Sequence, residues 1–516
     1  MTESNAAEPA LARPLPGIFS DPWRLTLVTV AAIGLLRLVT MFVTPLELYP
    51  DEAQYWTWSH TLDFGYWSKP PMVAWLIAAS TGIGGDGEAW IRLPSMLVHL
   101  AAALFLYGAG VRLFDRWSGY WAAVIYLLMP GVMVSSLVAS TDAGLLFFTA
   151  AALWAYAGLY RAGTERERMG SALALGIALG LGFLSKYAVL YFAGGLVLHA
   201  LVARDARAAW RARAAAVTVA AFALIALPNI LWNAAHRFAT VRHTAENANL
   251  KGGLFHPDAL VEFLVGQVGV FGPVGLAALA TAGVLALRRR TATAEERLLW
   301  CLTLPPLAVV TVLSILSRAN ANWAAIAYVP ASVLAAAWMT RAARARLWLG
   351  ATVGLQGLIA LTAAVLVMAP ALADAAGLAN SLKRVRGWRE TARLVTERAD
   401  RERALAPLAA VSVDDRFAFY ELAYYARDWL ARPGAPPLKI WVRRQAGNQA
   451  EATAPLTRET GRRALIASVV TNARGEIARD FAVVGPLEEH SVRLDRKHER
   501  DVVLFVGEDF APQPRK

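Results

Sequence analysis

Three carboxylates stand where the chain leaves long apolar runs. Asp51 and Glu52 are adjacent after the first run, and Asp142 lies between two later runs. An acid next to hydrocarbon is costly unless it faces a polar cavity or the membrane interface. A carboxylate in such a place can act as a general base that takes the proton of an acceptor hydroxyl.

Basic and polar side chains occupy the same loops as these acids. Cations can offset the negative charge that grows on a leaving phosphate, and a divalent metal held by oxygen ligands can share that task. Acids and cations at one membrane face therefore suit group transfer from a lipid phosphate. The candidates for phosphate contact are Lys69, Lys186, Arg237, Arg242, His243 and Arg318. Further candidates for substrate contact are Tyr55, Tyr66, His236, Asn247, Asn320, Asn322 and Trp323.

Each of these features also has a purely structural explanation. The pair Asp51-Glu52 can be solvated beside an aromatic belt at the membrane surface. Asp142 can serve as the N-cap of a helix, and Lys186 can extend its ammonium group to the interface. A transporter is the rival class of function, although transporters place charges in mid-span and carry internal repeats, and neither pattern is found here.

The composition indicates a polytopic α-helical membrane protein. Of 516 residues 57% are hydrophobic and 17% are charged, against roughly 25% charged residues in soluble domains. The single cysteine, Cys301, excludes an internal disulfide and a cysteine-based zinc cluster. The net charge of +12 suits cytoplasmic loops that face anionic membrane lipid, and we do not interpret it as nucleic-acid binding.

Hydropathy predicts about eleven membrane spans, since a span needs about 20 apolar residues. Basic residues gather in alternate loops, which the positive-inside rule assigns to the cytoplasm. Residues 171–203 are too few for two full spans, so we expect a hairpin of two short helices with Lys186 at its tip. The predicted spans are 24–44, 91–113, 120–138, 143–160, 171–185, 187–203, 215–233, 261–287, 298–316, 324–340 and 347–369.

Three parts follow from this arrangement. Residues 1–23 form a cytoplasmic tail, and residues 24–370 form a transmembrane domain with an external loop at 45–90. Residues 371–516 hold 45 of the 90 charged side chains, which predicts a soluble domain on the external side. Its apolar runs 464–470 and 501–506 read as strands. Together with a helix from Trp388, they predict a small α/β domain.

The motifs of the membrane region resemble, in their order, those of the bacterial protein O-mannosyltransferase-like glycosyltransferases. These belong to the integral-membrane GT-C class, which includes the aminoarabinose transferases of lipid A. The resemblance covers about residues 25–340 well and the tail only loosely. The motifs are Asp51-Glu52-Ala53-Gln54-Tyr55-Trp56, Gly65-Tyr66-Trp67-Ser68-Lys69-Pro70-Pro71, Arg92-Leu93-Pro94-Ser95, Asp142, Ser185-Lys186-Tyr187, Trp232-Asn233-Ala234-Ala235-His236 and Asn320-Ala321-Asn322-Trp323.

This resemblance implies transfer of a sugar from a polyprenyl-phosphate donor, with inversion, on the outer face of the bacterial inner membrane. It implies that Asp51 is the catalytic base, that Glu52 supports it, and that Asp142 is the second acidic position. Lys69 would meet the donor phosphate. The aminoarabinose transferases have Glu directly before that lysine, whereas this chain has Ser68, which removes one possible metal ligand.

The acceptor is the least constrained part of the prediction. The segment 371–516 has 25 Lys and Arg against 20 Asp and Glu, an excess that suits an anionic acceptor. We therefore expect a cell-envelope glycan or lipid such as lipopolysaccharide or lipid A. A protein Ser/Thr acceptor is the alternative.

Overall fold

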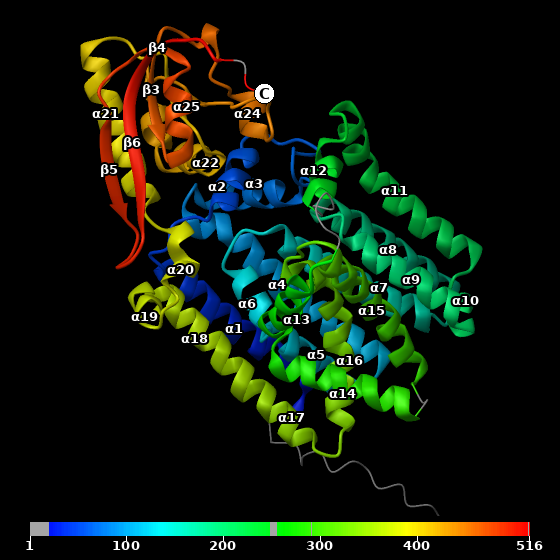
Figure 1. Ribbon diagram of the computed structural model, residues 1–516. Coiled ribbons are helices and arrows are strands. Elements are labelled where there is room, and N and C mark those ends of the chain that lie inside the picture. Colours follow the sequence, from blue (N-terminus) through cyan, green and yellow to red (C-terminus); the bar gives the residue numbers. More distant parts are fainter. Residues whose placement is uncertain (1–19, 248–254, 290–291, 514, 516) are drawn as a thin grey trace, which may run out of the picture. The chain divides into compact units, whose positions relative to one another are not determined.

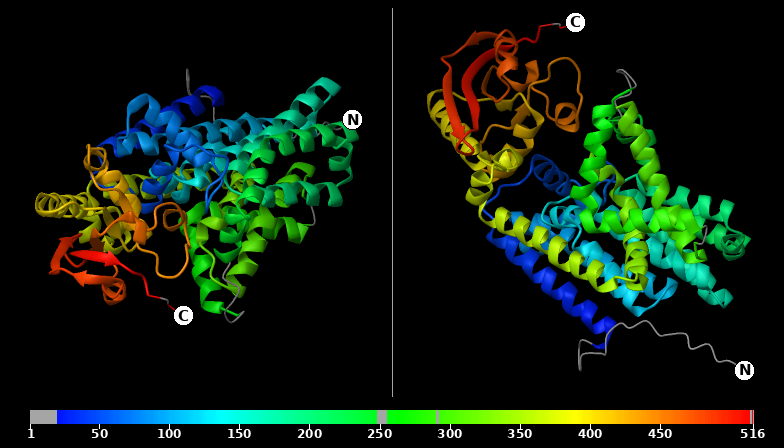
Figure 2. Two further views of the ribbon diagram at one scale, coloured as in Figure 1. Left: turned by 90° about the horizontal axis from the view of Figure 1, so that it is seen from above. Right: turned by 60° about the horizontal axis from the view of Figure 1, so that its bottom comes forward.

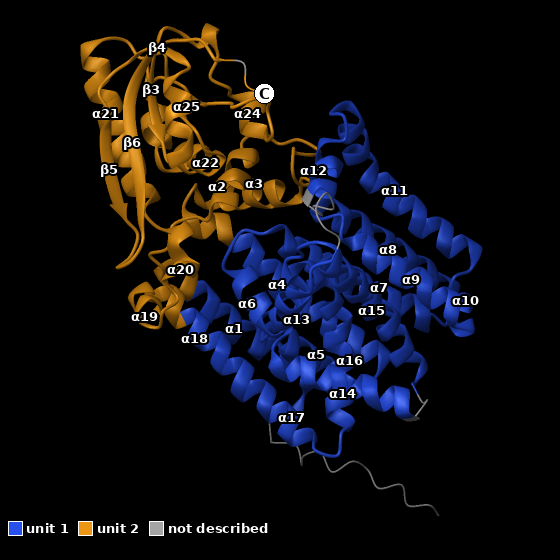
Figure 3. Cartoon of the chain, viewed as in Figure 1, with its two compact units in different colours: residues 1–39, 93–364 blue, residues 40–92, 365–516 orange. Residues whose placement is uncertain are grey.

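The computed structural model describes residues 20–247, 255–289, 292–513 and 515. The chain divides into two compact units, each made of two separate stretches of sequence (Figure 3). Unit 1 comprises Met1–Val39 and Leu93–Ala364, and unit 2 comprises Thr40–Arg92 and Val365–Lys516. The external loop predicted at 45–90 thus belongs to the same unit as the C-terminal domain. Most of the cytoplasmic tail predicted at 1–23 lies outside the described residues.

Unit 1 is a bundle of apolar helices (Figure 1). Two of its helices, α1 and α4, continue across the unit boundary, as does α18. The helices that contribute to unit 1 are α1 (Pro22–Val43), α4 (Glu88–Leu113), α5 (Arg116–Leu127), α6 (Pro130–Ser136), α7 (Thr141–Arg161), α8 (Glu165–Ser185), α9 (Val189–Val202), α10 (Arg204–Ala209), α11 (Ala212–Ala235), α12 (Ala239–Asn247), α13 (Pro257–Phe271), α14 (Pro273–Arg289), α15 (Ala294–Leu316), η2 (Ala321–Ala327), α16 (Tyr328–Arg341), α17 (Ala345–Ala351), η3 (Thr352–Gln356) and α18 (Gly357–Met368).

The chain is a multi-span membrane protein with fewer full spans than the predicted eleven. Within the described ranges, eight helices are long and apolar enough to cross a membrane, and two bent pairs raise this number to ten. The segment predicted at 187–203 accounts for the difference. Its helix α9 has 14 residues, a rise of about 21 Å, which falls short of a hydrocarbon core about 30 Å thick.

The hairpin expected at 171–203 is present, but only one of its helices is short. α8 has 21 residues because it begins at Glu165, where Thr164 and Glu167 form a capping box. Lys186 follows the last residue of α8, and α9 starts three residues later. The tip of the hairpin is therefore where the sequence predicts it.

Two spans are broken, and one glutamine forms hydrogen bonds to backbone groups at both breaks. α5 and α6 meet at 63°, and α13 and α14 meet at 109°. The Gln356 Nε2 donates to Leu128 O (3.3 Å) and Phe271 O (3.4 Å), and its Oε1 accepts from Gly275 N (3.2 Å). Backbone groups inside a bilayer have no water partners, so helix breaks there need such side-chain contacts. Gln356 ends a π-helical turn, a bulge that turns its amide toward both breaks.

The sharper break also depends on a glycine. Gly272 ends α13 with a φ of +89°, which L side chains rarely adopt, and a Cβ there would lie 2.7 Å from the Gln356 amide nitrogen. Arg37 of α1 supports the other break, because its Nη2 donates to Leu127 O at 2.6 Å, the end of α5. A cation at a helix C-terminus also interacts favourably with the helix dipole.

The first and last spans, α1 and α18, run side by side in Figure 1 and in the right-hand view of Figure 2. Their ends both lead into unit 2, where the Thr44 hydroxyl donates to Val367 O at 2.9 Å. The pairing explains how two stretches separated by more than 270 residues enter one folded unit.

Unit 2 contains an α/β domain, as predicted. The two predicted strands are β3 and β6, and the predicted helix is α21. Its elements are α2 (Pro50–Ser59), α3 (Met72–Gly84), α19 (Pro370–Ala375), α20 (Ala379–Leu382), η4 (Lys383–Val385), α21 (Trp388–Leu405), β1 (Ala410–Val413), α22 (Arg416–Tyr425), α23 (Arg427–Leu430), β2 (Leu438–Ile440), α24 (Gln449–Thr453), η5 (Arg458–Thr460), β3 (Arg463–Ser468), η6 (Thr471–Ala473), α25 (Arg474–Ala478), β4 (Phe481–Val484), β5 (Glu488–Arg493) and β6 (Glu499–Phe510).

The sheet of unit 2 is mixed. Its strands run in the order β2-β1-β3-β6-β4, and β5 also pairs with β6. β2, β1 and β3 are parallel, whereas β6 is antiparallel to each of its partners. The apolar strand β3 is buried along nearly its whole length, as expected for a central strand covered on both faces. α22 packs on β1 and β2, and also on α2 of the first loop.

A carboxyl group lies buried where α22 packs. Glu421 is 0% exposed, and neither of its oxygens has a hydrogen-bond partner among the described residues. Burial raises the pKa of Glu421 well above its usual value. The nearby carboxylates Glu47, Glu52 and Glu88 raise this pKa further, and only the Arg500 cation lowers it among the charges named. A buried carboxyl without a partner is held in the neutral form.

Replacing Gln356 by Leu should lower the thermal stability of the purified protein. The change keeps the side-chain volume but leaves Leu128 O, Phe271 O and Gly275 N without their side-chain partner. Each buried group left unsatisfied costs about 1–3 kcal/mol. The melting temperature in detergent measures the effect. Val353→Leu is the matched control, because Val353 is half exposed in the same π-helical turn. Equal melting of the two variants would contradict the assigned role of Gln356.

Glu421→Gln should make stability less dependent on pH. Because the folded-state pKa of Glu421 is raised, the folded state holds a proton that the unfolded state releases above its own pKa, about 4.3. The free energy of unfolding therefore falls as pH rises above that value. Melting temperatures between pH 5 and pH 8 should show the variant gaining on the wild type toward pH 8. Glu489→Gln, at an exposed position of β5, should keep the wild-type slope, and a wild-type slope in Glu421→Gln would show that this carboxyl does not titrate as proposed.

Candidate functional site

The two adjacent acids of the first loop have different surroundings. α2 begins at Pro50, so Asp51 and Glu52 both lie in its first turn. Successive residues of a helix point about 100° apart. The Glu52 side chain is 1% exposed, whereas that of Asp51 is 41% exposed. One acid is therefore buried in the protein, and its neighbour is presented at the surface.

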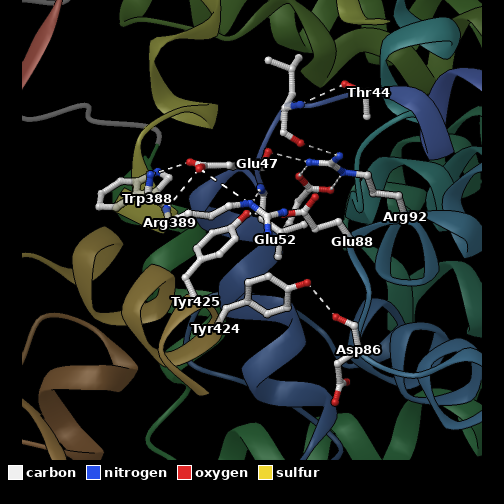
Figure 4. Close-up of polar contacts among 12 residues, drawn as sticks. Thr44, Glu47, Glu52, Asp86, Glu88, Arg92, Trp388, Arg389, Tyr424 and Tyr425 are labelled. Carbon is white, nitrogen blue, oxygen red and sulfur yellow. Dashed lines mark hydrogen bonds and ion pairs between the residues drawn. The ribbon is translucent and has the colours of Figure 1, made fainter. Parts of the chain in front are cut away.

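Glu52 is held by Arg92 in a buried, two-point ion pair (Figure 4). Arg92 Nε lies 3.0 Å from Glu52 Oε1, and its Nη2 lies 3.0 Å from Oε2. The same guanidinium donates to Leu46 O at 3.2 Å and to Glu47 O at 2.7 Å. Glu52 Oε2 also accepts from Tyr49 N at 2.8 Å. Glu52 thus fixes the start of α2, with its carboxylate held by Arg92 and by Tyr49 N.

Glu47 connects the first loop to the C-terminal domain. Its Oε2 accepts from Trp388 N at 2.5 Å, and its Oε1 accepts from Arg389 N at 3.2 Å, at the start of α21 (Figure 4). A carboxylate at a helix N-terminus satisfies donors that have no partner within the helix. Burial raises the pKa of Glu47, and these two backbone hydrogen bonds oppose that rise.

Two tyrosines of α22 form hydrogen bonds to the same loop. Tyr425 Oη donates to Glu88 Oε1 and accepts from Leu48 N, both at 2.7 Å. Tyr424 Oη donates to Asp86 O at 2.7 Å, as Figure 4 shows for both rings. The Tyr424 ring also packs edge-on against the Trp56 ring of α2, with centroids 5.0 Å apart. These contacts hold α22 against α2.

The exposed acid Asp51 faces a cation of the same helix α22. Arg416 Nη2 lies 4.0 Å from Asp51 Oδ1, and the Arg416 side chain is 33% exposed. At this distance the two groups attract without a hydrogen bond. The sequence-based site did not include Arg416, since 365 positions separate it from Asp51 along the chain.

The other candidates of the first loop are largely packed. Tyr55 is 4% exposed and Tyr66 1%; the Tyr66 ring stacks on Trp58 with centroids 4.5 Å apart. They act as the core of the loop in this structure. Lys69 is half-buried, and two residues before it Trp67 N donates to Gln449 Oε1 at 3.3 Å. The C-terminal domain therefore also touches the segment that carries Lys69.

Unit 1 brings together three of the predicted site residues. Lys186 Nζ lies 2.6 Å from Asp142 Oδ1, and Asn322 Nδ2 donates to Asp142 Oδ2 at 2.7 Å. Asp142 is not the N-cap of its helix: Ser140 takes that position and accepts from Asp142 N at 3.1 Å. The Asp142 carboxylate binds the Lys186 ammonium and the Asn322 amide.

The turn after α11 carries the next group of candidates. Arg237 and Phe238 have φ values of +54° and +55°, the left-handed region that is costly for side-chain-bearing residues. Asn233 O accepts from Phe238 N at 2.6 Å and so stabilises this turn. Arg237 and Arg242 are exposed, and strained backbone of this kind is frequent at functional sites.

The remaining candidates of unit 1 lie around the turn after α11, on α12 and at the start of η2. His236 stacks on Trp232, with centroids 4.0 Å apart. Arg318 lies 3.5 Å from Glu262, and both are exposed. Asn320 is exposed and Trp323 is half-buried. His243 is half-buried in α12, and the Asn247 side chain lies outside the described part of the structure.

The carboxylates that the sequence offers to a divalent metal have protein partners in this structure. No three or more His, Cys, Asp or Glu side chains gather as a metal site within the described ranges. Both oxygens of Glu52 are bound by Arg92, and those of Asp142 by Lys186 and Asn322.

Part of the membrane region matches a known family model, and longer parts of the chain match known proteins. Residues 68–232 match the family model described as dolichyl-phosphate-mannose-protein mannosyltransferase. Over 320 residues the chain is 41% identical to the lipid A galacturonosyltransferase RgtD of Rhizobium johnstonii, which covers 60% of this chain and 65% of that protein. It is 28% identical over 173 residues to an undecaprenyl phosphate-aminoarabinose arabinosyl transferase of Yersinia enterocolitica, covering 30% and 31% of the two chains. The chain thus matches less than two thirds of the length of these curated relatives.

The shared fold covers more of the chain than the sequence matches do. The crystal structure of ArnT from Cupriavidus metallidurans bound to undecaprenyl phosphate superimposes with a TM-score of 0.64 at 17% identity, covering 95% of this chain and 99% of that one. The apo form of the same protein gives a TM-score of 0.61. The family match thus lies in the membrane region, and the fold of ArnT is shared over nearly the whole chain.

Proposed function

We propose that this protein is an inverting glycosyltransferase that moves a sugar from a polyprenyl-phosphate donor to a glycan or lipid of the cell envelope. The observation that carries the proposal is the exposed carboxylate of Asp51, held on a helix that Glu52 and Arg92 anchor. The relative named as a lipid A galacturonosyltransferase supports the acceptor class, and the relative named for undecaprenyl phosphate supports the donor class.

The proposed reaction is a single displacement. Asp51 accepts the proton of the acceptor hydroxyl, whose oxygen forms a bond to the anomeric carbon of the donor sugar. The bond from that carbon to the phosphate oxygen breaks, and the polyprenyl phosphate leaves with the electron pair. Attack opposite to the leaving group inverts the configuration at the anomeric carbon.

Cationic side chains would stabilise the phosphate that leaves. Lys69 in unit 2, and Arg237 and Arg242 in unit 1, remain our candidates for this role, since each lies outside the candidate spans. In unit 1 the Asp142–Lys186 pair is partly buried. We propose that Asp142 orients the Lys186 ammonium, which then binds a phosphate from a fixed position.

The proposed location is the bacterial inner membrane, with the active site facing the periplasm. The basic loops between spans would face the cytoplasm by the positive-inside rule. The first loop and the C-terminal domain form one unit, which requires that both lie on the same side of the membrane. A protein Ser/Thr acceptor is the second candidate, favoured by the protein mannosyltransferase family model that residues 68–232 match.

Deleting the gene should remove one sugar from an envelope glycolipid. Mass spectrometry of extracted glycolipids and of envelope glycoproteins, with and without the gene, measures the difference directly. Restoring the gene should restore the sugar. A sugar lost from a glycoprotein instead would favour the second candidate, and a defect in solute uptake with unchanged glycans would favour a transporter.

Asp51→Asn should reduce transfer from a polyprenyl-phosphate sugar by about 10²–10⁴-fold, the usual loss when one general base is removed. The change keeps the size of the side chain, and among the described residues the Asp51 carboxylate lies 4.0 Å from Arg416 and takes no part in the capping box of α2, so the melting temperature should not change. Turnover of purified protein in detergent is the measurement. Asp428→Asn, at a side chain 94% exposed in the same unit, serves as the control. Asp51 would not be the base if a folded Asp51→Asn protein kept turnover within a few-fold of the wild type.

A further inference from the structure

Helix α22 presents its first residue beside the exposed acid of α2. Asp415 caps α22 by accepting from Phe417 N at 2.8 Å and Ala418 N at 3.1 Å. Asp414 accepts from Ser468 Oγ at 2.6 Å and Val469 N at 3.0 Å, which ties the start of α22 to the end of β3. The position of Arg416 is thus fixed from both sides of the helix start.

The rest of α22 is fixed as firmly. Tyr424 and Tyr425 bind the segment 86–88 of the first loop, and α22 packs along α2. Arg416 therefore holds a defined place relative to Asp51, although it comes from the opposite end of the chain. All of these contacts lie within unit 2.

The surroundings of Arg416 differ from those of other arginines of the domain. Arg398, Arg463 and Arg386 each form a close ion pair with a carboxylate, and their side chains are largely buried. The Arg416 guanidinium makes no hydrogen bond to any residue that the structure describes; it lies 4.7 Å from the Phe417 ring and 4.0 Å from Asp51. A third of the side chain is exposed. The donors of this guanidinium are available to a ligand.

The position of Arg416, just after a strand of the sheet, also favours ligand binding. It follows the carboxyl end of β1, the central strand of the parallel set β2-β1-β3. In open α/β sheets ligands bind outside the carboxyl ends of such strands. The guanidinium fork matches the two oxygens of a carboxylate or a phosphate better than an ammonium does.

We propose that Arg416 binds an oxyanion of a substrate beside Asp51 and thereby makes the site selective for charged substrates. The inference rests on the proposed function, in which Asp51 is the base. Two sources share this chemistry: a phosphate on a glycolipid acceptor, or the carboxylate of a uronic acid on the donor. In either case Arg416 is a specificity residue, since it contacts a group remote from the bond that is formed.

The test measures equilibrium binding, so it does not depend on turnover. Quenching of tryptophan fluorescence in detergent reports binding of four probes to purified protein. The probes are lipid A with and without its phosphates, and undecaprenyl-phosphate galacturonic acid and its galactose counterpart. Arg416→Gln should weaken binding of one probe that carries the additional oxyanion about 10- to 100-fold, the range of a hydrogen bond between charged groups, and should leave binding of the counterpart without that oxyanion unchanged.

Matched variants separate charge from shape. Arg416→Lys keeps the charge and loses the fork, so its binding should fall between wild type and Arg416→Gln. Arg462→Gln removes an exposed arginine of the same unit with its own partners, Glu508 and Asp509, and should bind all probes as the wild type does.

The outcomes are distinct. Loss of discrimination between the two forms of lipid A assigns the oxyanion to the acceptor, and loss between the two donors assigns it to the sugar. Equal weakening of all four probes would overturn the proposal and leave Arg416 a structural residue, as would unchanged binding of every probe. Absence of transfer by the wild-type protein, with these binding differences intact, would instead contradict the proposed function.

Discussion

The ion pair between Glu52 and Arg92 determines the geometry of the candidate site. A buried ion pair must overcome the cost of removing two charges from water, and it does so only when the remaining donors and acceptors are satisfied. Here the Arg92 guanidinium also binds Leu46 O and Glu47 O, and Glu52 also binds Tyr49 N. These contacts join the N-terminal part of α4, which contains Arg92, to the start of α2. As a result, the neighbouring acid Asp51 has a fixed direction.

A common physical need explains several unusual side chains. Helix ends carry backbone groups without partners, and burial makes each of them costly. Gln356 serves two broken spans, Arg37 serves the end of α5, and Glu47 serves the start of α21. In each case the partner comes from a distant stretch of sequence. The polar residues of the apolar regions are thus mostly bound to the irregular backbone that forms the membrane fold and its junctions.

Much of the fold is predictable from the sequence, because hydropathy reports spans directly. The strands β3 and β6 and the helix α21 stand at the predicted positions, as does the tip at Lys186. α9 is short as expected, whereas α8 was predicted too short, since it begins at Glu165 through the capping box of Thr164 and Glu167. The breaks of 63° and 109° were not predicted either: they depend on a π-helical turn and on tertiary contacts that leave no local pattern.

The candidate site was predictable in part. The pairing of Asp142, Lys186 and Asn322 agrees with their selection from sequence as site residues. The division of labour between Asp51 and Glu52 was not foreseeable, because it depends on which acid meets Arg92. Arg416 carried no signal at all, since an isolated arginine among 25 basic residues of the tail is unremarkable. Only the packing of α22 on α2 brings it to Asp51.

The composition of unit 2 from two stretches of sequence restricts how such proteins can exchange parts. Recombination that replaced residues 365–516 alone would pair a foreign α22 with the resident α2, and the contacts of Tyr424, Tyr425 and Glu47 would be lost together. A functional hybrid needs three crossover points, near residues 40, 92 and 365. Inheritance of a new C-terminal domain is therefore coupled to inheritance of the first loop, and the two stretches are expected to diversify as one module.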